Sequence, residues 1–478
     1  MNEVAMFEPA VYQARRAALC AALSAQLREA GVSVGLILLP GNAESPMNYT
    51  DNTYRFRQDS AFLYCFGLAE PDMAATIDVA SGRTTLYADE LTVDMLVWTG
   101  PRLGVAALAA ACAADDVQPS AALPCTLRAA AARDGLPLFL PPYRGETCLR
   151  LAAWLDVPAA MLADKASLPL IKAMIALRQI KEEREVEQIE QAVNTTIAMH
   201  RAVMALGTPG RSEAALMAEA TRVALAGGGM PSFPPIATVR GAVLHNHGYP
   251  GYLRSGDLFL LDAGAETVMG YAGDLTTTFP VDGKYSPQQR AIYEIVLAAG
   301  KAAAGLLKPG LPFKEAHFAA ARTIVEGLQA LGLMSGPLDE IIAAGAHALF
   351  FPHGLGHQMG LDVHDMESLG EAQVGYDGQP KSTQFGLKSL RLAKPLLAGM
   401  VLTIEPGIYF IEGLIALWRA EGRFKQYIHY DRLEPWLQAG GYRNEENWLI
   451  RADGAHLLGA RFDKSVAGME TALAGRRS

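Results

Sequence analysis

Acidic residues inside apolar segments place the strongest constraint on how this 478-residue chain can fold. Gly256–Gly264 (GDLFLLDAG) reads as a buried strand that ends in Asp262, and Gly270–Pro280 (GYAGDLTTTFP) reads as a returning strand that carries Asp274. The residues between them, Glu266–Gly270, are predicted to form a hairpin turn that sets the two aspartates side by side. Two carboxylates at such a short distance repel each other, and the pKa of at least one of them is raised unless a cation lies between them.

Two further carboxylates occur in similar surroundings. Val401–Tyr409 (VLTIEPGIY) is an apolar strand with Glu405 at its end, and Glu445 follows Arg443 by two residues. Residues two apart face the same way in an extended chain, so Arg443 and Glu445 are expected on one face. One acidic residue at a strand end is usually a cap or turn acceptor. Burying four charged carboxylates in apolar surroundings costs free energy unless each has a hydrogen-bond or ionic partner.

The stretch Phe351–His364 (FPHGLGHQMGLDVH) supplies nitrogen donors, because it holds three of the ten histidines: His353, His357 and His364. Its glycines are expected to let a ligand approach the backbone. A lone histidine is usually a solvated or core residue, so the carboxylates decide the interpretation. Two divalent cations would balance the four acidic residues, with His357 as the nitrogen donor, and such oxygen-rich ligation favours Mn²⁺.

A chain of this length is expected to form two domains. Alternating strands and helices up to about Val157 predict a self-contained α/β domain. Its predicted strands are Gly35–Pro40, Phe62–Phe66, Ala74–Asp78 and Thr84–Ala88, and its predicted helices begin at Pro9 and span Val105–Ala114. Downstream, Val186, Ile189 and Val193 share one face of a charged helix, and Ser286–Gln289 is a capping box.

Two polar and aromatic runs in the N-terminal part are read as surface structure. Tyr54–Ser60 is predicted to be a structured loop with satisfied polar groups, and Trp98–Gly100 a surface turn with one packed indole. Neither run indicates a function without further evidence.

Charge and composition exclude several partners and compartments. The net charge of −9 comes without a basic stripe, which argues against nucleic acid. No apolar run reaches the length of a membrane span, and the start has no signal-peptide pattern. Cysteines at positions 20, 65, 112, 125 and 148 form no Cys-x-x-Cys pair, so we expect free thiols and a cytoplasmic protein without a membrane partner.

The acidic residues and His357, in their order along the chain, resemble the dinuclear metal signature of the pita-bread metallopeptidases. Their surroundings are most similar to the proline-specific branch, aminopeptidase P and prolidase. The matching segments are Val243–His247, Leu261–Gly264, Tyr271–Asp274, Phe351–His364, Thr403–Tyr409 and Arg443–Glu445. Tyr54–Ser60 and Gly67–Pro71 resemble the aminopeptidase P N-terminal domain. The resemblance implies an α/β (α+β) chain with a creatinase/aminopeptidase P-like domain over 1–165 and a pita-bread catalytic domain over 166–478.

The resemblance also implies roles for individual residues. Asp262 would chelate one of two metal ions (Mn²⁺, or else Co²⁺ or Zn²⁺), Asp274 and Glu445 would bridge both, and His357 and Glu405 would complete the other. The remaining matches imply substrate contacts for His245, His353, His364 and Arg443. Among these, His364 and His245 would hydrogen-bond the oxyanion, Arg443 would support them, and Glu405 would shuttle the proton of the nucleophile.

The activity implied first is that of a Xaa-Pro aminopeptidase, in which a metal-bridged hydroxide attacks the bond before proline. Its substrates are peptides with proline at the second position. A homodimer or homotetramer is implied, and Trp98 resembles a tryptophan lent to a neighbouring subunit's site. One alternative is a Xaa-Pro dipeptidase, with Arg419 holding the free proline carboxylate. A remote alternative is a pita-bread protein that binds without catalysis.

Three departures from the family pattern stand out. The interval from Asp262 to Asp274 is one residue longer than usual. Asn444 stands where an apolar residue is expected. Finally, 411–440 is an inserted loop that resembles bacterial prolidase.

Overall fold

The computed structural model describes residues 6–30 and 35–476 and forms two compact units. The first comprises the chain up to Arg178 together with Met366–Gln373, and the second comprises Gln179–Asp365 and the chain from Val374 onward. The domain boundary at residue 165 stays a prediction, since compactness alone defines these units.

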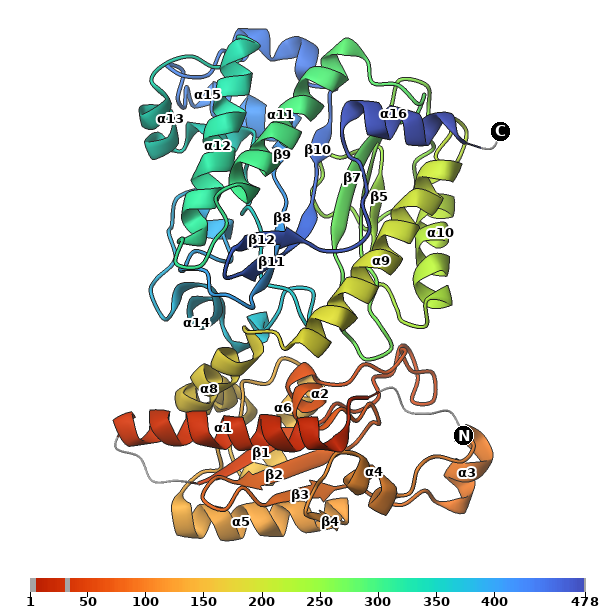
Figure 1. The fold of residues 1–478 in the computed structure, drawn as a ribbon, viewed down its shortest axis with the longest axis vertical. Coiled ribbons are helices and arrows are strands. Elements are labelled where there is room, and N and C mark those ends of the chain that lie inside the picture. Colours follow the sequence, from red (N-terminus) through yellow and green to blue (C-terminus); the bar gives the residue numbers. More distant parts are fainter. Residues whose placement is uncertain (1–5, 31–34, 477–478) are drawn as a thin grey trace. The chain divides into compact units, whose positions relative to one another are not determined.

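The first unit is built on a four-stranded sheet of strand order β1-β2-β3-β4 (Figure 1). β1 (Leu36–Pro40), β2 (Ala74–Asp78) and β3 (Thr84–Tyr87) pair antiparallel, and β4 (Asp116–Gln118) runs parallel to β3. Its helices are α1 (Pro9–Ala30), α2 (Ser60–Phe66), α3 (Val93–Thr99), α4 (Val105–Ala111), α5 (Leu123–Asp134), α6 (Gly145–Leu155), α7 (Leu162–Lys165) and α8 (Leu168–Arg178). Leu36 and Leu38 share one face of β1 and join the core formed by α5 and α6. The predicted strands at β1, β2 and β3 and the helix from Pro9 are confirmed.

The strand predicted at Phe62–Phe66 is wrong, because this segment is helix α2. Asp59 caps the helix by accepting a hydrogen bond from Phe62 N–H at 2.9 Å, and Gly67 ends it at a φ of 68°. All seven helical residues are buried. A short, wholly apolar run therefore carried no periodicity from which helix and strand could be told apart.

The turn predicted at Trp98–Gly100 is also wrong. Trp98 belongs to α3, and its side chain is 86% exposed instead of packed. None of the seven residues of α3 is buried. The helix predicted over Val105–Ala114 exists as α4 but ends three residues early, at Ala111.

The second unit contains two antiparallel three-stranded sheets and a strand pair. β5 (Ile236–Thr238), β6 (Leu258–Ala263) and β7 (Leu275–Pro280) form one sheet, in that order. β12 (Gly454–Leu457), β11 (Glu446–Arg451) and β8 (Val401–Ile404) form the other, and β9 (Gly407–Tyr409) pairs with β10 (Gly441–Arg443). Thr278 of β7 links the first of these sheets to the strand pair: its hydroxyl donates to Arg443 O at 2.9 Å and accepts from Arg443 N–H at 3.1 Å.

Helices flank these sheets and supply the core (Figure 1). They are α9 (Glu183–Leu206), α10 (Glu213–Ala226), α11 (Pro287–Ala304), α12 (Phe313–Ala330), α13 (Leu338–Ala344), α15 (Glu412–Ala420) and α16 (Val466–Ala474); α14 (Glu371–Tyr376) spans the residue at which the chain re-enters the second unit. The predicted capping box is confirmed, since Ser286 and Gln289 bond reciprocally ahead of α11. Val186, Ile189 and Val193 are buried on α9, as predicted.

Two smaller sequence predictions have clear outcomes. All five cysteines lie in the described residues and are free thiols, as expected. The insertion over 411–440 is not an irregular loop, because it contains α15 and short 3₁₀ turns at Tyr430–Arg432 and Glu434–Trp436.

Across the described ranges, no helix is long and apolar enough to span a bilayer.

Replacing Gly67 with alanine should destabilise the first unit more than the same change at Gly82. Both glycines have positive φ, 68° and 74°, which costs an L-residue about 1–2 kcal/mol. A Cβ at Gly67 would also lie 2.2 Å from the Tyr12 ring, whereas nothing lies within 4 Å at Gly82. We expect Gly67→Ala to lose about 1–3 kcal/mol beyond Gly82→Ala in urea unfolding. Equal losses would contradict this account of how α2 ends.

Candidate active site

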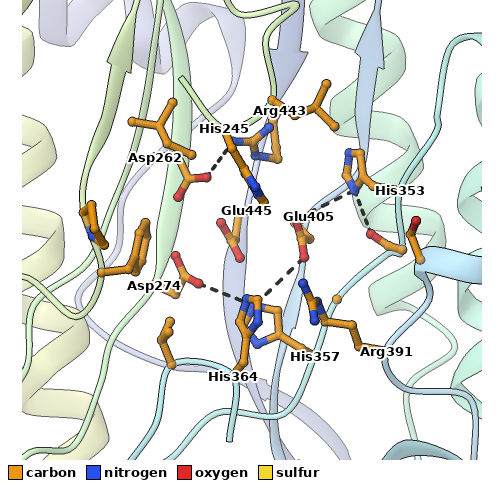
Figure 2. Close-up of a pocket in the computed structure, with 18 of the residues that line it drawn as sticks. His245, Asp262, Asp274, His353, His357, His364, Arg391, Glu405, Arg443 and Glu445 are labelled. Atoms are coloured by element: carbon orange, nitrogen blue, oxygen red, sulfur yellow. Dashed lines mark hydrogen bonds and ion pairs between the residues drawn. The ribbon is translucent and has the colours of Figure 1, made fainter. Parts of the chain in front are cut away.

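A cavity of about 580 Å³ in the second unit collects the site residues predicted from the sequence (Figure 2). All nine of them line it: His245, Asp262, Asp274, His353, His357, His364, Glu405, Arg443 and Glu445. They come from segments up to 200 positions apart, so the sheets and their connections assemble the site.

Strand alternation explains why Asp262 faces the cavity. Phe259, Leu261 and Ala263 of β6 belong to the helix-covered core, while Leu260 and Asp262 point the other way. Asp262 lies opposite Thr276 in the β6–β7 ladder. The hairpin is therefore confirmed, but Asp274 is two residues beyond the directly opposite position, on the same face.

The histidine stretch lies beside Glu405 because it pairs with β8. Thr403 N–H donates to His357 O at 2.9 Å, and Glu405 N–H donates to Leu355 O at 2.8 Å. A Cβ at Gly356 would lie 2.0 Å from Thr403 O, so this contact requires glycine. The glycine was expected to admit a ligand, but its first role is this approach to the chain's own backbone.

Three donor groups lie close enough to share a metal ion. One ligand atom each from Asp274, His357 and Glu445 lies within 4.8 Å of the others. His357 Nδ1 is 3.0 Å from Gln358 O, which places its proton on Nδ1 and its lone pair on Nε2. His357 Nε2 is 3.5 Å from Asp274 Oδ2, and Asp274 Oδ1 is buried without a hydrogen-bond partner among the described residues. A cation bound between Asp274, His357 and Glu445 would accept electron pairs from all three side chains.

The pKa shifts point to the same requirement for positive charge. Burial raises the pKa of Glu405 to about 8, with Asp262 adding to the shift and Arg443 opposing it. Burial also raises the pKa of Asp274 and of Glu445, and neighbouring carboxylates raise both further. Divalent cations would stabilise the ionised forms that this arrangement disfavours.

Arg443 is buried and holds several site groups in place. Its Nη2 donates to Asp262 Oδ2 at 2.5 Å, its Nε to Thr276 Oγ1 at 3.2 Å and its Nη1 to the Tyr409 hydroxyl at 2.7 Å. Burial opposes its charge, but Tyr409 and the carboxylates raise the pKa of Arg443 overall. Arg443 therefore stays positively charged and orients the Asp262 carboxylate.

Tyr409 connects this arginine to His353. Its hydroxyl lies 2.9 Å from His353 Nε2, while His353 Nδ1 lies 2.8 Å from Gly354 O. His353 therefore donates through Nδ1 and accepts from Tyr409 through Nε2. Burial lowers the pKa of His353 to about 3, so its ring is neutral.

His364 and His245 occupy different walls of the cavity. The His364 ring lies 4.0 Å from the His357 ring, centroid to centroid. His245 belongs to the connection between β5 and β6, together with His247, which also lines the cavity. Burial and then Arg443 lower the pKa of His245.

Sequence reasoning missed Tyr409, Arg391 and His247. Tyr409 and His247 lie inside the matching segments, four residues after Glu405 and two residues after His245, so closeness in the chain to those candidates is the signal that could have found them. Arg391 lies in an irregular segment without any such signal. Arg419, the cation suggested for the dipeptidase alternative, is wrong, because it is not among the described residues that line the cavity. Its side chain instead donates to Tyr430 O and lies 3.9 Å from the Glu434 carboxylate.

Asn444, which departs from the family pattern, is buried and accommodated by a polar contact. Its Nδ2 donates to the Tyr293 hydroxyl at 3.3 Å.

Comparisons with known proteins identify the family of this chain. Residues 187–452 match metallopeptidase family M24, and residues 12–137 match the aminopeptidase P N-terminal domain. A Xaa-Pro dipeptidase of Homo sapiens is 31% identical, covering 99% of this chain and 95% of its own length. A probable Xaa-Pro aminopeptidase of Metarhizium robertsii is 30% identical, with coverages of 90% and 88%.

Solved structures show the same architecture. Proline aminopeptidase P II from Yersinia pestis superposes with a TM-score of 0.79 at 28% identity, covering 98% of this chain and 100% of its own. Aminopeptidase PepP from Pseudomonas aeruginosa gives 0.77 at 27%, with 98% of each chain covered. The predicted two-domain α/β fold is thereby confirmed. The chain belongs to metallopeptidase family M24, in the group of aminopeptidase P and prolidase, and is a Xaa-Pro peptidase.

Proposed function

We propose that this chain hydrolyses Xaa-Pro dipeptides and that its cofactors are two divalent metal ions. The observation that carries the length preference is Arg391, which shares the cavity with the carboxylates and histidines (Figure 2). A Xaa-Pro dipeptide has a free carboxylate on its proline, and arginine binds carboxylates through two parallel hydrogen bonds. A longer peptide has a neutral amide there and gains much less from this cation.

The second candidate is the Xaa-Pro aminopeptidase that the sequence favoured. Similarity to solved aminopeptidases P over 98% of the chain supports it. The dipeptidase is supported by the cavity arginine and by similarity to the human protein named Xaa-Pro dipeptidase over 99% of the chain. The two candidates share their chemistry and differ in what they bind beyond the proline.

The residues proposed to hold the ions are Asp262, Asp274, His357, Glu405 and Glu445. Four carboxylates and one imidazole suit Mn²⁺ best, with Co²⁺ or Zn²⁺ as alternatives. When bound there, the ions polarise the scissile carbonyl and lower the pKa of an attacking water. The unpartnered Asp274 Oδ1 and the raised pKa values of the carboxylates support this assignment.

Glu405 is proposed to hold the proton of the attacking water. Its two oxygens face different partners, because Oε1 lies 4.0 Å from His357 Nε2 and Oε2 lies 3.9 Å from His353 Nδ1. Oε1 is therefore on the metal-ligand side, and Oε2 is the atom that takes the proton. His364 and His245 donate hydrogen bonds to the carbonyl oxygen as charge develops on it.

His353 and apolar neighbours are proposed to form the wall that recognises proline. A prolyl amide has no N–H, so this wall needs no acceptor for it. Phe233, Pro234 and Val363 line the cavity together with the neutral His353. Tyr409 bonds to His353 and accepts a hydrogen bond from Arg443, which keeps this wall in a fixed position.

A homodimer or homotetramer is the proposed assembly, with α3 packed against a second copy of the chain. Val93, Val97 and Trp98 are 75–86% exposed on this helix, and Met95 and Leu96 are 44–46% exposed. An exposed apolar patch of this kind marks an interaction surface. The likeness of Trp98 to a tryptophan shared between subunits supports this choice of partner.

Arg391→Met should separate the two candidate activities. We expect KM for a Xaa-Pro dipeptide to rise about 30- to 1000-fold, since the carboxylate loses its charged partner, while a Xaa-Pro-Xaa tripeptide changes little. Arg419→Met is the matched control, because that arginine lies outside the cavity. Equal losses on both substrates would favour the aminopeptidase.

His357→Ala and His364→Ala form a matched pair on neighbouring rings. Bound metal, measured by elemental analysis, should fall in His357→Ala, because a ligand is lost. In His364→Ala metal should be retained while kcat falls about 100-fold, because only substrate contacts are lost. The reverse pattern would show that the two roles are exchanged.

Trp98→Asp should reduce the assembly size in analytical ultracentrifugation, since a charge on α3 opposes burial of its apolar face. Leu149→Asp is the control, because Leu149 is 69% exposed on α6 of the same unit. A wild-type chain that sediments as a monomer would contradict the proposed assembly.

A further inference from the structure

Glu213 is a fully buried acid that lies outside the group of described residues that line the cavity. Its Oε1 accepts hydrogen bonds from Val239 N–H at 2.9 Å and from the Thr238 hydroxyl at 3.0 Å, and its Oε2 accepts one from Gly251 N–H at 2.7 Å. Its own N–H donates to Gly251 O at 2.9 Å. One residue therefore bonds to both ends of the segment 239–251.

This segment carries His245 and His247 into the cavity. Within the described residues 240–250 the chain forms neither helix nor strand, so no ladder fixes its course. The side-chain amide of Asn246, between the two histidines, bonds to Thr238 Oγ1 at 2.9 Å. The middle of the segment is thus tied to the same buried cluster as its ends.

The surroundings of Glu213 suit a hydrogen-bond acceptor that holds this arrangement. Glu213 is the first residue of α10, where the helix dipole favours negative charge. A Cβ at Gly251 would lie 2.6 Å from the Glu213 carboxyl carbon, so the glycine leaves room for the carboxylate against the backbone.

We propose that Glu213 is a positioning residue that aims the histidines of segment 239–251 at the substrate. The inference rests on the proposed function, in which His245 contacts the reacting carbonyl. Glu213 touches no substrate and acts only through the segment that it holds. A displacement of about 1 Å in such a group costs about 100-fold in rate.

Glu213→Gln tests this with little change of shape, because one acceptor oxygen becomes an amide that faces N–H donors. We expect kcat to fall about 10- to 100-fold with bound metal unchanged. Gly251→Ala should act similarly by displacing the carboxylate. Glu219→Gln is the matched control on the same helix, since Glu219 pairs with Arg222 at the surface and should keep wild-type kcat.

Two further readouts separate positioning from general damage. In the double variant with His245→Ala, Glu213→Gln should add almost no loss, because both changes remove one contribution. Amide hydrogens of Val239 and Gly251 should exchange faster in Glu213→Gln, while those of β6 stay protected. Multiplicative losses, or unchanged exchange at both amides, would overturn the inference.

The inference and the proposed function fail in different ways. Turnover lost in His245→Ala but kept in Glu213→Gln contradicts the positioning role alone. Wild-type turnover in His245→Ala contradicts the proposed role of His245, and the inference with it.

Discussion

Repulsion among buried carboxylates is the constraint on which the rest of this structure depends. Strands β6 and β8 are apolar on the side facing the helices, and each carries an acid at or near its end towards the cavity. Folding therefore brings Asp262, Asp274, Glu405 and Glu445 into one cavity, where burial and then neighbouring carboxylates raise the pKa of the last three. The hydrophobic core and the acidic cavity are two faces of the same strands, so the site is inseparable from the fold.

Arginine side chains and neutral imidazoles surround the four carboxylates, and the arginines offset part of their negative charge. Arg443 compensates Asp262 and, through Tyr409, fixes a neutral His353. Three histidines from one stretch thereby acquire different surroundings: His357 faces carboxylates, His364 lies beside it with its ring tilted by 48°, and His353 bonds to Tyr409. Arg391 adds a second positive charge to the lining of the same cavity, and the proposed dipeptidase activity rests on it.

The sequence predicted those parts of the molecule that a single physical signal determines. The predicted hairpin placed Asp262 correctly beside the strand that follows Asp274, and the capping box located the start of α11. The sequence-based predictions were wrong where contacts with distant parts of the chain determine the local structure. The apolar run Phe62–Phe66 is helical because Asp59 caps it, and Trp98 is exposed although a packed indole was expected. Arg419 was named for the dipeptidase alternative because the inserted segment was conspicuous, and Arg391 was missed because the path of the chain around residue 391 left no pattern in the sequence.

The most direct test of the account is calorimetric titration of Mn²⁺ into the metal-free protein near pH 7, repeated in buffers of different ionisation enthalpy. Since burial raises the pKa of Glu405 to about 8, binding of the cations should release its proton, and the heat should depend on the buffer. We expect two ions per chain and net proton release. A stoichiometry below two, or a heat independent of the buffer, would contradict the claim that paired divalent ions relieve the buried negative charge.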